Sequence, residues 1–239
     1  MTRQITQNNI LNLLPDATYS AWEPYFESVE LPMGKVLYDP SSTLSHMYFP
    51  TSAIVSWVYM LENGATTEIA MTGREGVLGM YMLMGGGKTQ NQGIVQTAGQ
   101  AIRLPVQVVL DTFSQGHEVQ SIFWLFTRAL ITQMAQIAVC HRHHTLDQQL
   151  CRMLLLTLER IDGDTIVMTH EVMASLLGVR REGVTMAAQK LMHEGIIRYA
   201  RGRITVLDRA RLAQRACECY GVIHQEYERL LPQSPHCRH

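Results

Sequence analysis

The segment from Thr169 to Gly195 constrains the fold most, because two amphipathic helical patterns meet there at one glycine. The first pattern follows Thr169, a residue type that caps helix N-termini, and stops at Gly178, which permits a sharp turn. Small residues around such a turn let two helices cross closely, so the segment predicts a helix-turn-helix. The second pattern has an inner face made of Val184, Ala187, Ala188, Leu191 and Met192.

A basic β-hairpin is predicted directly after these two helices. The run IIRYARGRITVLD reads as two strands around Arg201-Gly202-Arg203, which form a wing. Between Thr169 and Arg211 there are eight basic and four acidic residues, although the whole chain has a net charge of −1. A basic segment in a nearly neutral chain is the electrostatic footprint of a small nucleic-acid-binding module.

The second helix carries side chains suited to reading DNA bases. In a helix-turn-helix, the N-terminal residues of this helix reach base edges in the major groove, where arginine bonds guanine and glutamate accepts from cytosine. Arginines of the wing are expected to contact phosphates, which adds affinity rather than sequence information. The alternative is an ordinary helix pair with a solvated charged face. The predicted DNA-binding residues are Thr169, Arg180, Arg181, Glu182, Thr185, Gln189, Arg201 and Arg203.

The N-terminal half predicts β structure. From Val29 to about Pro105, short apolar runs alternate with turn residues, a pattern typical of an antiparallel barrel or sandwich. Asn63-Gly64 between two such runs predicts a two-residue hairpin. We expect helices near 8–14, 21–26 and 107–115, on either side of this β region.

A long apolar helix is predicted over residues 121–144. Large apolar side chains along it point in more directions than one barrel can cover, so we expect the helix to pair with its own copy; the alternative is packing on the barrel alone. Spacings of seven, four and three residues define the expected dimer interface as Phe123, Leu130, Met134 and Ile137.

A hinge is expected at His144–Thr145. Thr145 and Gln148 have the spacing of a capping box, which starts a new helix there. The predicted organisation is therefore a β domain at 1–120, a dimerisation helix at 121–144 and a DNA-binding domain with a C-terminal helix at 145–239.

A cytoplasmic protein is expected. The N-terminus is polar and shows no apolar signal segment, and the longest apolar run contains Arg128, which disfavours a membrane span. The five unevenly spaced cysteines favour reduced thiols over a disulfide framework.

From about Pro32 to Asp208, the chain resembles the Crp/Fnr family of bacterial transcription regulators, which are related to the cyclic-AMP receptor protein. The most specific part is GVRREGVTMAAQKLMHEGIIRYARGRITV, which is similar to the family's Arg-Glu-x-Val recognition helix, with Arg181 and Glu182 at the base-reading positions. Met186 stands where the family often has a second arginine.

This resemblance implies an α+β fold, with an N-terminal antiparallel β-roll like a cyclic-nucleotide-binding domain, a long dimerisation helix and a C-terminal winged helix-turn-helix. It also implies a homodimer on near-palindromic double-stranded DNA, contact with RNA polymerase, and activity modulated through the β-roll.

The resemblance is weaker where relatives bind cyclic nucleotides. Those relatives hold the ribose with Gly-Glu and the cyclic phosphate with Arg-Ser/Thr-Ala. Here Gly79 keeps the glycine, but Met80 replaces the glutamate and Asn91-Gln92-Gly93 replaces the arginine segment. Without that arginine the phosphate loses a charge-assisted contact, so cyclic AMP is not expected and no cofactor is predicted. The iron–sulfur branch of the family needs an N-terminal cysteine cluster, but no cysteine precedes Cys140.

Two short runs contain metal-ligating residue types. The first run is residues 140–144, in which Cys140 and His144 share a helix face. We interpret it as the polar end of a helix; the alternative is a metal- or haem-dependent sensor that uses these side chains. Cys217 and Cys219 lie two apart in an expected helix, where side chains diverge by roughly 200°, so we expect no shared metal there. No metal site is predicted.

An enzyme is not expected. Neither an HExxH nor a GxSxG motif occurs, and the glycines before Lys88 lack the leading glycine of a phosphate-binding loop. A metal-dependent enzyme using the histidine-rich run is the remaining alternative from a different class.

Overall fold

The N-terminal domain consists of two antiparallel sheets with short helices before them. The computed structural model describes residues 6–231 except residue 87. One sheet has the order β1-β7-β3 and the other β2-β6-β4-β5. The elements are α1 (Asn9–Leu13), α2 (Asp16–Trp22), η1 (Glu23–Tyr25), β1 (Glu27–Leu31), β2 (Val36–Tyr38), β3 (His46–Pro50), β4 (Ile54–Met60), β5 (Thr66–Thr72), η2 (Met80–Leu83), β6 (Gln92–Thr97) and β7 (Gly99–Pro105).

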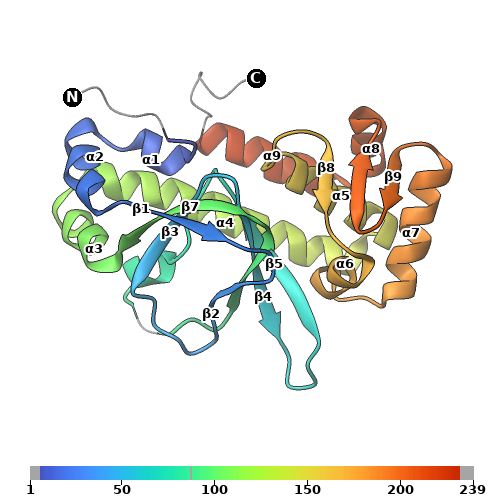
Figure 1. Cartoon of the computed structure of the whole chain (residues 1–239), viewed down its shortest axis with the longest axis horizontal. Helices are drawn as coiled ribbons and strands as arrows, with labels where there is room; N and C mark the ends of the chain where they lie inside the picture. Colours follow the sequence, from blue (N-terminus) through green and yellow to red (C-terminus); the bar gives the residue numbers. More distant parts are fainter. Residues whose placement is uncertain (1–5, 87, 232–239) are drawn as a thin grey trace.

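A long helix joins this domain to a smaller one. After α3 (Val106–Gln115), α4 runs over His117–His143 behind the β-roll and reaches the C-terminal domain (Figure 1). By length and composition, α4 is the one helix in the described residues that could cross a membrane. A core helix of a soluble protein passes the same test, so this is weak evidence for a membrane span.

The C-terminal domain is a helical unit with a three-stranded sheet in the order β8-β10-β9. Its last helix returns to lie along α4 (Figure 1). The elements are α5 (Leu146–Leu158), β8 (Thr165–Val167), α6 (His170–Leu177), α7 (Arg181–His193), β9 (Ile197–Ala200), β10 (Arg203–Val206), α8 (Arg209–Arg215) and α9 (Glu218–Leu230). The α+β fold with an antiparallel β-roll, a long helix and a winged helix-turn-helix is confirmed.

The capping box between α4 and α5 is confirmed. The Thr145 side chain accepts from the Gln148 backbone, and the Gln148 side chain accepts from the Thr145 backbone at 3.0 Å. His144 and Thr145 both have extended backbone, so the helix breaks at the expected position.

Three local predictions differ from the structure. The long helix begins at His117 rather than at residue 121, and α2 begins at Asp16 rather than near residue 21. The expected two-residue hairpin is a three-residue connection, because the Leu61 N–H bonds the Ala65 carbonyl at 2.8 Å. Gly64 in this loop has φ +82°, the left-handed conformation that such a connection needs at its last position.

The predicted dimer interface on α4 is wrong. Phe123, Leu130 and Ile137 are buried in the chain's own core, and Met134 is half-buried. Gln133 lies on the same buried side, where its amide donates to the Met71 carbonyl at 3.0 Å and to the Tyr227 hydroxyl at 2.9 Å. This face therefore packs within one chain, the alternative considered: it contacts β5 and α9 around Gln133 and the rings of Trp22 and Phe113 at Phe123.

A second set of α4 residues is exposed. Its members recur at alternating spacings of three and four residues, the repeat of a coiled coil. The apolar Ile131 lies in the middle of the set and is 59% exposed. We call the set the outer stripe: Ser121, Trp124, Arg128, Ile131, Ala135, Ala138 and Arg142.

A buried ion pair fastens the two domains together. Arg160, just after α5, is buried, and its Nε donates to Oε1 of Glu75 in the loop after β5 at 2.7 Å. Its Nη1 donates to the Leu156 carbonyl at 2.7 Å, and its guanidinium lies 5.4 Å from the ring centre of Tyr227 in α9. One side chain thus joins the β-roll, α5 and α9.

The β4–β5 hairpin forms a second contact between the domains. Thr66 Oγ1 lies 2.6 Å from Ser175 Oγ in α6. A Cβ added at Gly178 would lie 2.5 Å from Thr67 Oγ1. The hairpin therefore touches the turn of the helix-turn-helix directly.

Candidate DNA-binding surface

The turn between α6 and α7 has the predicted form. Thr169 caps α6 by accepting from the Val172 N–H at 3.2 Å. Gly178 ends the helix with φ +66°, and the Val179 N–H bonds back to the Ala174 carbonyl at 3.0 Å. The left-handed backbone and the nearby hairpin both favour glycine at this position.

The inner face of α7 is confirmed except at one residue. Four of its expected members are buried against the rest of the domain: Val184, Ala187, Ala188 and Leu191. Met192 is instead 40% exposed, so its assignment to the inner face is wrong. Gly195 follows the helix with φ +68°, as expected for a residue that closes it.

The outer face of α7 carries most of the predicted base-reading residues in exposed positions. Arg180 is the N-cap, and Arg181 and Glu182 are in the first turn, so all three side chains lie at the leading end of the helix. Arg181 Nε is 3.9 Å from Oε2 of the exposed Glu171, a loose pair. Gln189 is exposed further along the helix.

Two positions on α7 alter this surface. Thr185 is half-buried, and its hydroxyl donates to the Arg181 carbonyl at 3.0 Å. It is therefore already engaged within the helix. Met186, where the resemblance implies an arginine in many relatives, is 61% exposed, one helical turn after Glu182.

His170 is a site residue that the sequence analysis missed. Its Nδ1 lies 3.0 Å from Thr185 Oγ1, and its ring stacks on Tyr199 of β9 with ring centres 4.2 Å apart. Burial, and then the charge of Arg181, lower the pKa of His170, which favours the neutral ring. His170 therefore links α6, α7 and the wing, a role that no local spacing in the sequence indicates.

The wing has a tight basic turn. Arg201 and Gly202 have φ +51° and +74°, the left-handed pair of a type I′ hairpin. Arg201 and Arg203 are both exposed, and Thr169 is exposed at the nearby start of α6. The Gly202 carbonyl accepts from the Met168 N–H at 2.8 Å, which ties the wing to α6. The third strand, β8, was not predicted.

Residues 91–93 of the β-roll, which stand in place of the cyclic-phosphate motif, contact neighbouring residues of the same domain. Asn91 is buried and accepts from Thr89 Oγ1 at 2.9 Å. Gln92 bonds Asp39 at 2.5 Å, and a Cβ at Gly93 would lie 2.4 Å from the Tyr38 ring. Met80 is buried, so neither replaced motif presents a charged side chain to the interior.

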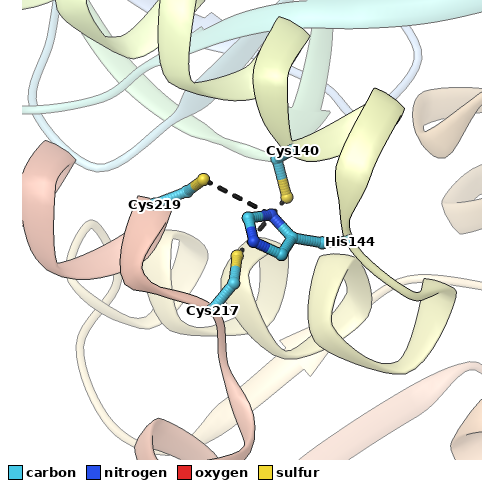
Figure 2. Close-up of side chains that lie close together, drawn as sticks. All are labelled: Cys140, His144, Cys217 and Cys219. Atoms are coloured by element: carbon cyan, nitrogen blue, oxygen red, sulfur yellow. Dashed lines mark hydrogen bonds between the residues drawn. The ribbon is translucent and has the colours of Figure 1, made fainter.

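Four metal-ligating side chains converge at the end of α4. Cys140 and His144 come from that end, and Cys217 and Cys219 come from the start of α9 (Figure 2). One ligand atom of each lies within 4.8 Å of the others. The argument that Cys217 and Cys219 must diverge is wrong, because Cys217 precedes the helix with an extended backbone, φ −81° and ψ 167°.

Comparisons with known proteins agree with this architecture. Residues 148–215 match the family described as the Crp-like helix-turn-helix domain. The chain is 23% identical over 214 residues to the global nitrogen regulator of Nostoc sp., a match that covers 84% of this chain and 94% of that protein.

Solved structures show the same fold. A transcriptional regulator of the Crp/Fnr family from Eubacterium rectale matches with a TM-score of 0.68 and 15% identity, over 87% of this chain and 97% of that one. FixK2 from Bradyrhizobium japonicum matches with a TM-score of 0.67 and 16% identity, over 80% of this chain and 98% of that one. The chain therefore has the fold of the Crp/Fnr transcriptional regulators and contains a Crp-like helix-turn-helix domain at residues 148–215.

Proposed function

We propose that the protein is a homodimeric, sequence-specific regulator of transcription that binds near-palindromic double-stranded DNA in the cytoplasm. The observation that carries this proposal is the exposed leading end of α7, where Arg180, Arg181 and Glu182 project from a helix whose opposite face is buried. The role is that of a regulator rather than an enzyme, and its contacts include RNA polymerase. Four free cysteines at residues 140, 151, 217 and 219 are consistent with a reducing compartment.

In the proposed complex, α7 enters the major groove with its N-terminal end toward the bases. Arg181 bonds a guanine and Glu182 accepts from a cytosine, the pairings that suit these side chains. Arg201 and Arg203 at the wing lie against the phosphate backbone, together with the exposed cap residue Thr169.

Arg181→Ala is expected to weaken binding to the specific site by about 1–3 kcal/mol and to relax selectivity at one base position. The loss arises because two hydrogen bonds to one base disappear while the phosphate contacts remain. Quantitative gel-shift titrations against a set of single-base variants measure both effects. Arg103→Ala, which removes a half-buried arginine of the β-roll far from α7 in the sequence, is the matched control and leaves affinity unchanged. Unchanged base selectivity in Arg181→Ala would contradict the assignment.

Arg201→Ala is expected to weaken binding to all DNA sequences similarly and to reduce the salt slope of log K by about one. The reason is that a phosphate contact releases a counterion but reads no base. Titrations of specific and unrelated DNA at several salt concentrations measure the slope. A loss confined to the specific site would show that Arg201 reads a base instead.

The outer stripe of α4 is the proposed dimer interface, in place of the buried residues first expected there. Its three-and-four spacing matches a two-stranded coiled coil, and two helices related by a two-fold axis bring the two copies of Ile131 together. Trp124 and Ala138 lie at equivalent spacings toward either end. A dimer of this kind presents two recognition helices to two half-sites.

Regulation is proposed to act through the β-roll as a population shift between two arrangements of the domains. The contact between Thr66 and Ser175 supports this, because a shift of the β4–β5 hairpin acts directly on α6. The hinge between His144 and Thr145 supplies the bend. Cyclic AMP is not the proposed effector, because Met80 and the segment 91–93 lack the charges that its ribose and phosphate need.

A further inference from the structure

We propose that Cys140, His144, Cys217 and Cys219 bind one zinc ion in a closed tetrahedral site. Three cysteine sulfurs and one histidine nitrogen form a common ligand set for structural zinc. The proposal is independent of DNA binding, since it rests only on these four side chains and their neighbours.

The distances between ligand atoms suit a single ion. Cys140 Sγ lies 3.5 Å from Cys217 Sγ, and Cys219 Sγ lies 3.6 Å from His144 Nδ1. Two ligands bound about 2.3 Å from a tetrahedral zinc are about 3.8 Å apart. Figure 2 shows the four side chains pointing toward one common point from the ends of two helices. The geometry thus needs little adjustment to accept zinc.

The imidazole of His144 is already oriented for a metal. Its Nδ1 faces the sulfurs, and its Nε2 lies 3.2 Å from Oε2 of Glu218. Metal-bound histidines usually donate their second ring N–H to a carboxylate in this way. Gln149 donates to the His144 carbonyl at 2.9 Å, which holds the backbone at the end of α4.

A buried cation balances the charge of the site. Three thiolates and one Zn²⁺ leave a net charge of −1. Arg152 in α5 is buried, and its Nε and Nη1 have no hydrogen-bond partner within the described residues. Arg152 interacts electrostatically with the Cys140 side chain, so its positive charge acts on the site. Bound zinc with its three thiolates therefore adds a negative charge near this guanidinium, which also interacts with the buried Glu68.

Other occupants fit less well. A haem places a wide flat ring against one or two axial ligands, whereas here four ligand atoms lie within 4.8 Å of one another. A disulfide between Cys140 and Cys217 would use two of the sulfurs and leave Cys219 and His144 facing an empty position.

The site joins three elements around the hinge. Two of its ligands end α4 and two begin α9, while Arg152 approaches from α5. Bound zinc therefore fixes α9 against the end of the long helix, at the point where α4 and α5 meet. We infer that zinc clamps the DNA-binding domain to the dimerisation helix.

Metal analysis of the full chain, purified without chelator from cells grown with zinc, tests the site. We expect one zinc ion per chain, and at least a tenfold loss of bound zinc in Cys217→Ala and Cys219→Ala. Cys151→Ala is the matched control, because Cys151 is buried in α5 outside the cluster, and it retains the metal. Wild-type protein without zinc, or equal loss in the control variant, would overturn the proposal.

A cobalt titration tests the geometry without a variant. Full-length protein, stripped with a chelator and reduced, is titrated with Co²⁺. The expected result is intense d–d absorption of tetrahedral cobalt with thiolate charge-transfer bands, both saturating at one equivalent and both lost on adding zinc. Only the weak spectrum of octahedral cobalt would refute the site. Neither experiment depends on DNA, so failure of the DNA-binding proposal leaves both readouts unchanged.

Discussion

Ile131→Glu is expected to convert the dimer into monomers. Ile131 lies at the centre of the outer stripe, and in the proposed dimer it packs against its own copy. Two carboxylates buried there without partners cost several kcal/mol, on the scale of about 3–5 kcal/mol for an uncompensated buried charge. Sedimentation velocity at micromolar protein measures the change. The same variant loses about 10²–10⁴-fold in affinity for a two-half-site operator, because each half-site is then bound alone.

A matched control separates this effect from general damage. Leu61, at the base of the β4–β5 loop, is 63% exposed, so Leu61→Glu adds the same charge at a similarly exposed apolar position outside the stripe. It is expected to remain dimeric. An Ile131→Glu protein that still sediments as a dimer would show that the interface lies elsewhere.

Glu75→Ala is expected to lower the free energy of unfolding by about 3–5 kcal/mol. Arg160 cannot lose its charge, so removal of Glu75 leaves a buried guanidinium without the carboxylate that its Nε bonds at 2.7 Å. The ion pair also joins the β-roll to α5, so the loss affects both domains. Urea denaturation at a fixed protein concentration measures it, since dimerisation makes stability depend on concentration.

Asp162→Ala is the matched control for this prediction. It removes the neighbouring ion pair between Arg74 and Asp162, which also bridges the two domains but leaves Asp162 85% exposed. An exposed pair of this kind contributes at most about 1 kcal/mol. Equal losses in the two variants would mean that burial does not set the strength of the Glu75–Arg160 pair.

Local signals in the sequence predicted the caps and turns of the DNA-binding domain. The cap at Thr169, the left-handed Gly178 and the Arg201-Gly202 turn each depend on a few neighbouring residues, and each is found in the structure. The capping box at Thr145 is equally local and located the break between α4 and α5 to the residue. His170 was missed because its partners, Thr185 and Tyr199, come from elements distant in the sequence.

The face of α4 could not be assigned in this way. The helix has one buried apolar face and one exposed stripe with apolar members, and both repeat at helical spacing. Periodicity identifies such faces but not their partners, so Phe123 and Leu130 were assigned to a second chain although they pack within this one. The return of α9 onto α4, which covers the region of Gln133, has no local sequence signal.

The cysteine–histidine cluster depends on the same long-range return. Cys140 and Cys217 meet only because α9 begins beside the end of α4. The helical geometry used to separate Cys217 from Cys219 did not apply, because a helix boundary falls between them. The whole run from Arg211 to Leu231 was predicted as one helix, and the break between α8 and α9 was enough to hide the site.

Sequencing of random genomic DNA fragments retained by the purified full-length protein, at moderate salt and without added ligand, tests the central claim most directly. The account predicts enrichment of a two-fold symmetric motif whose half-sites lie about one helical turn apart. The Arg181→Ala protein, run in parallel, enriches a motif with one degenerate position in each half-site. Retention that varies only with salt, with no motif enriched, would contradict a sequence-specific regulator that reads DNA through α7.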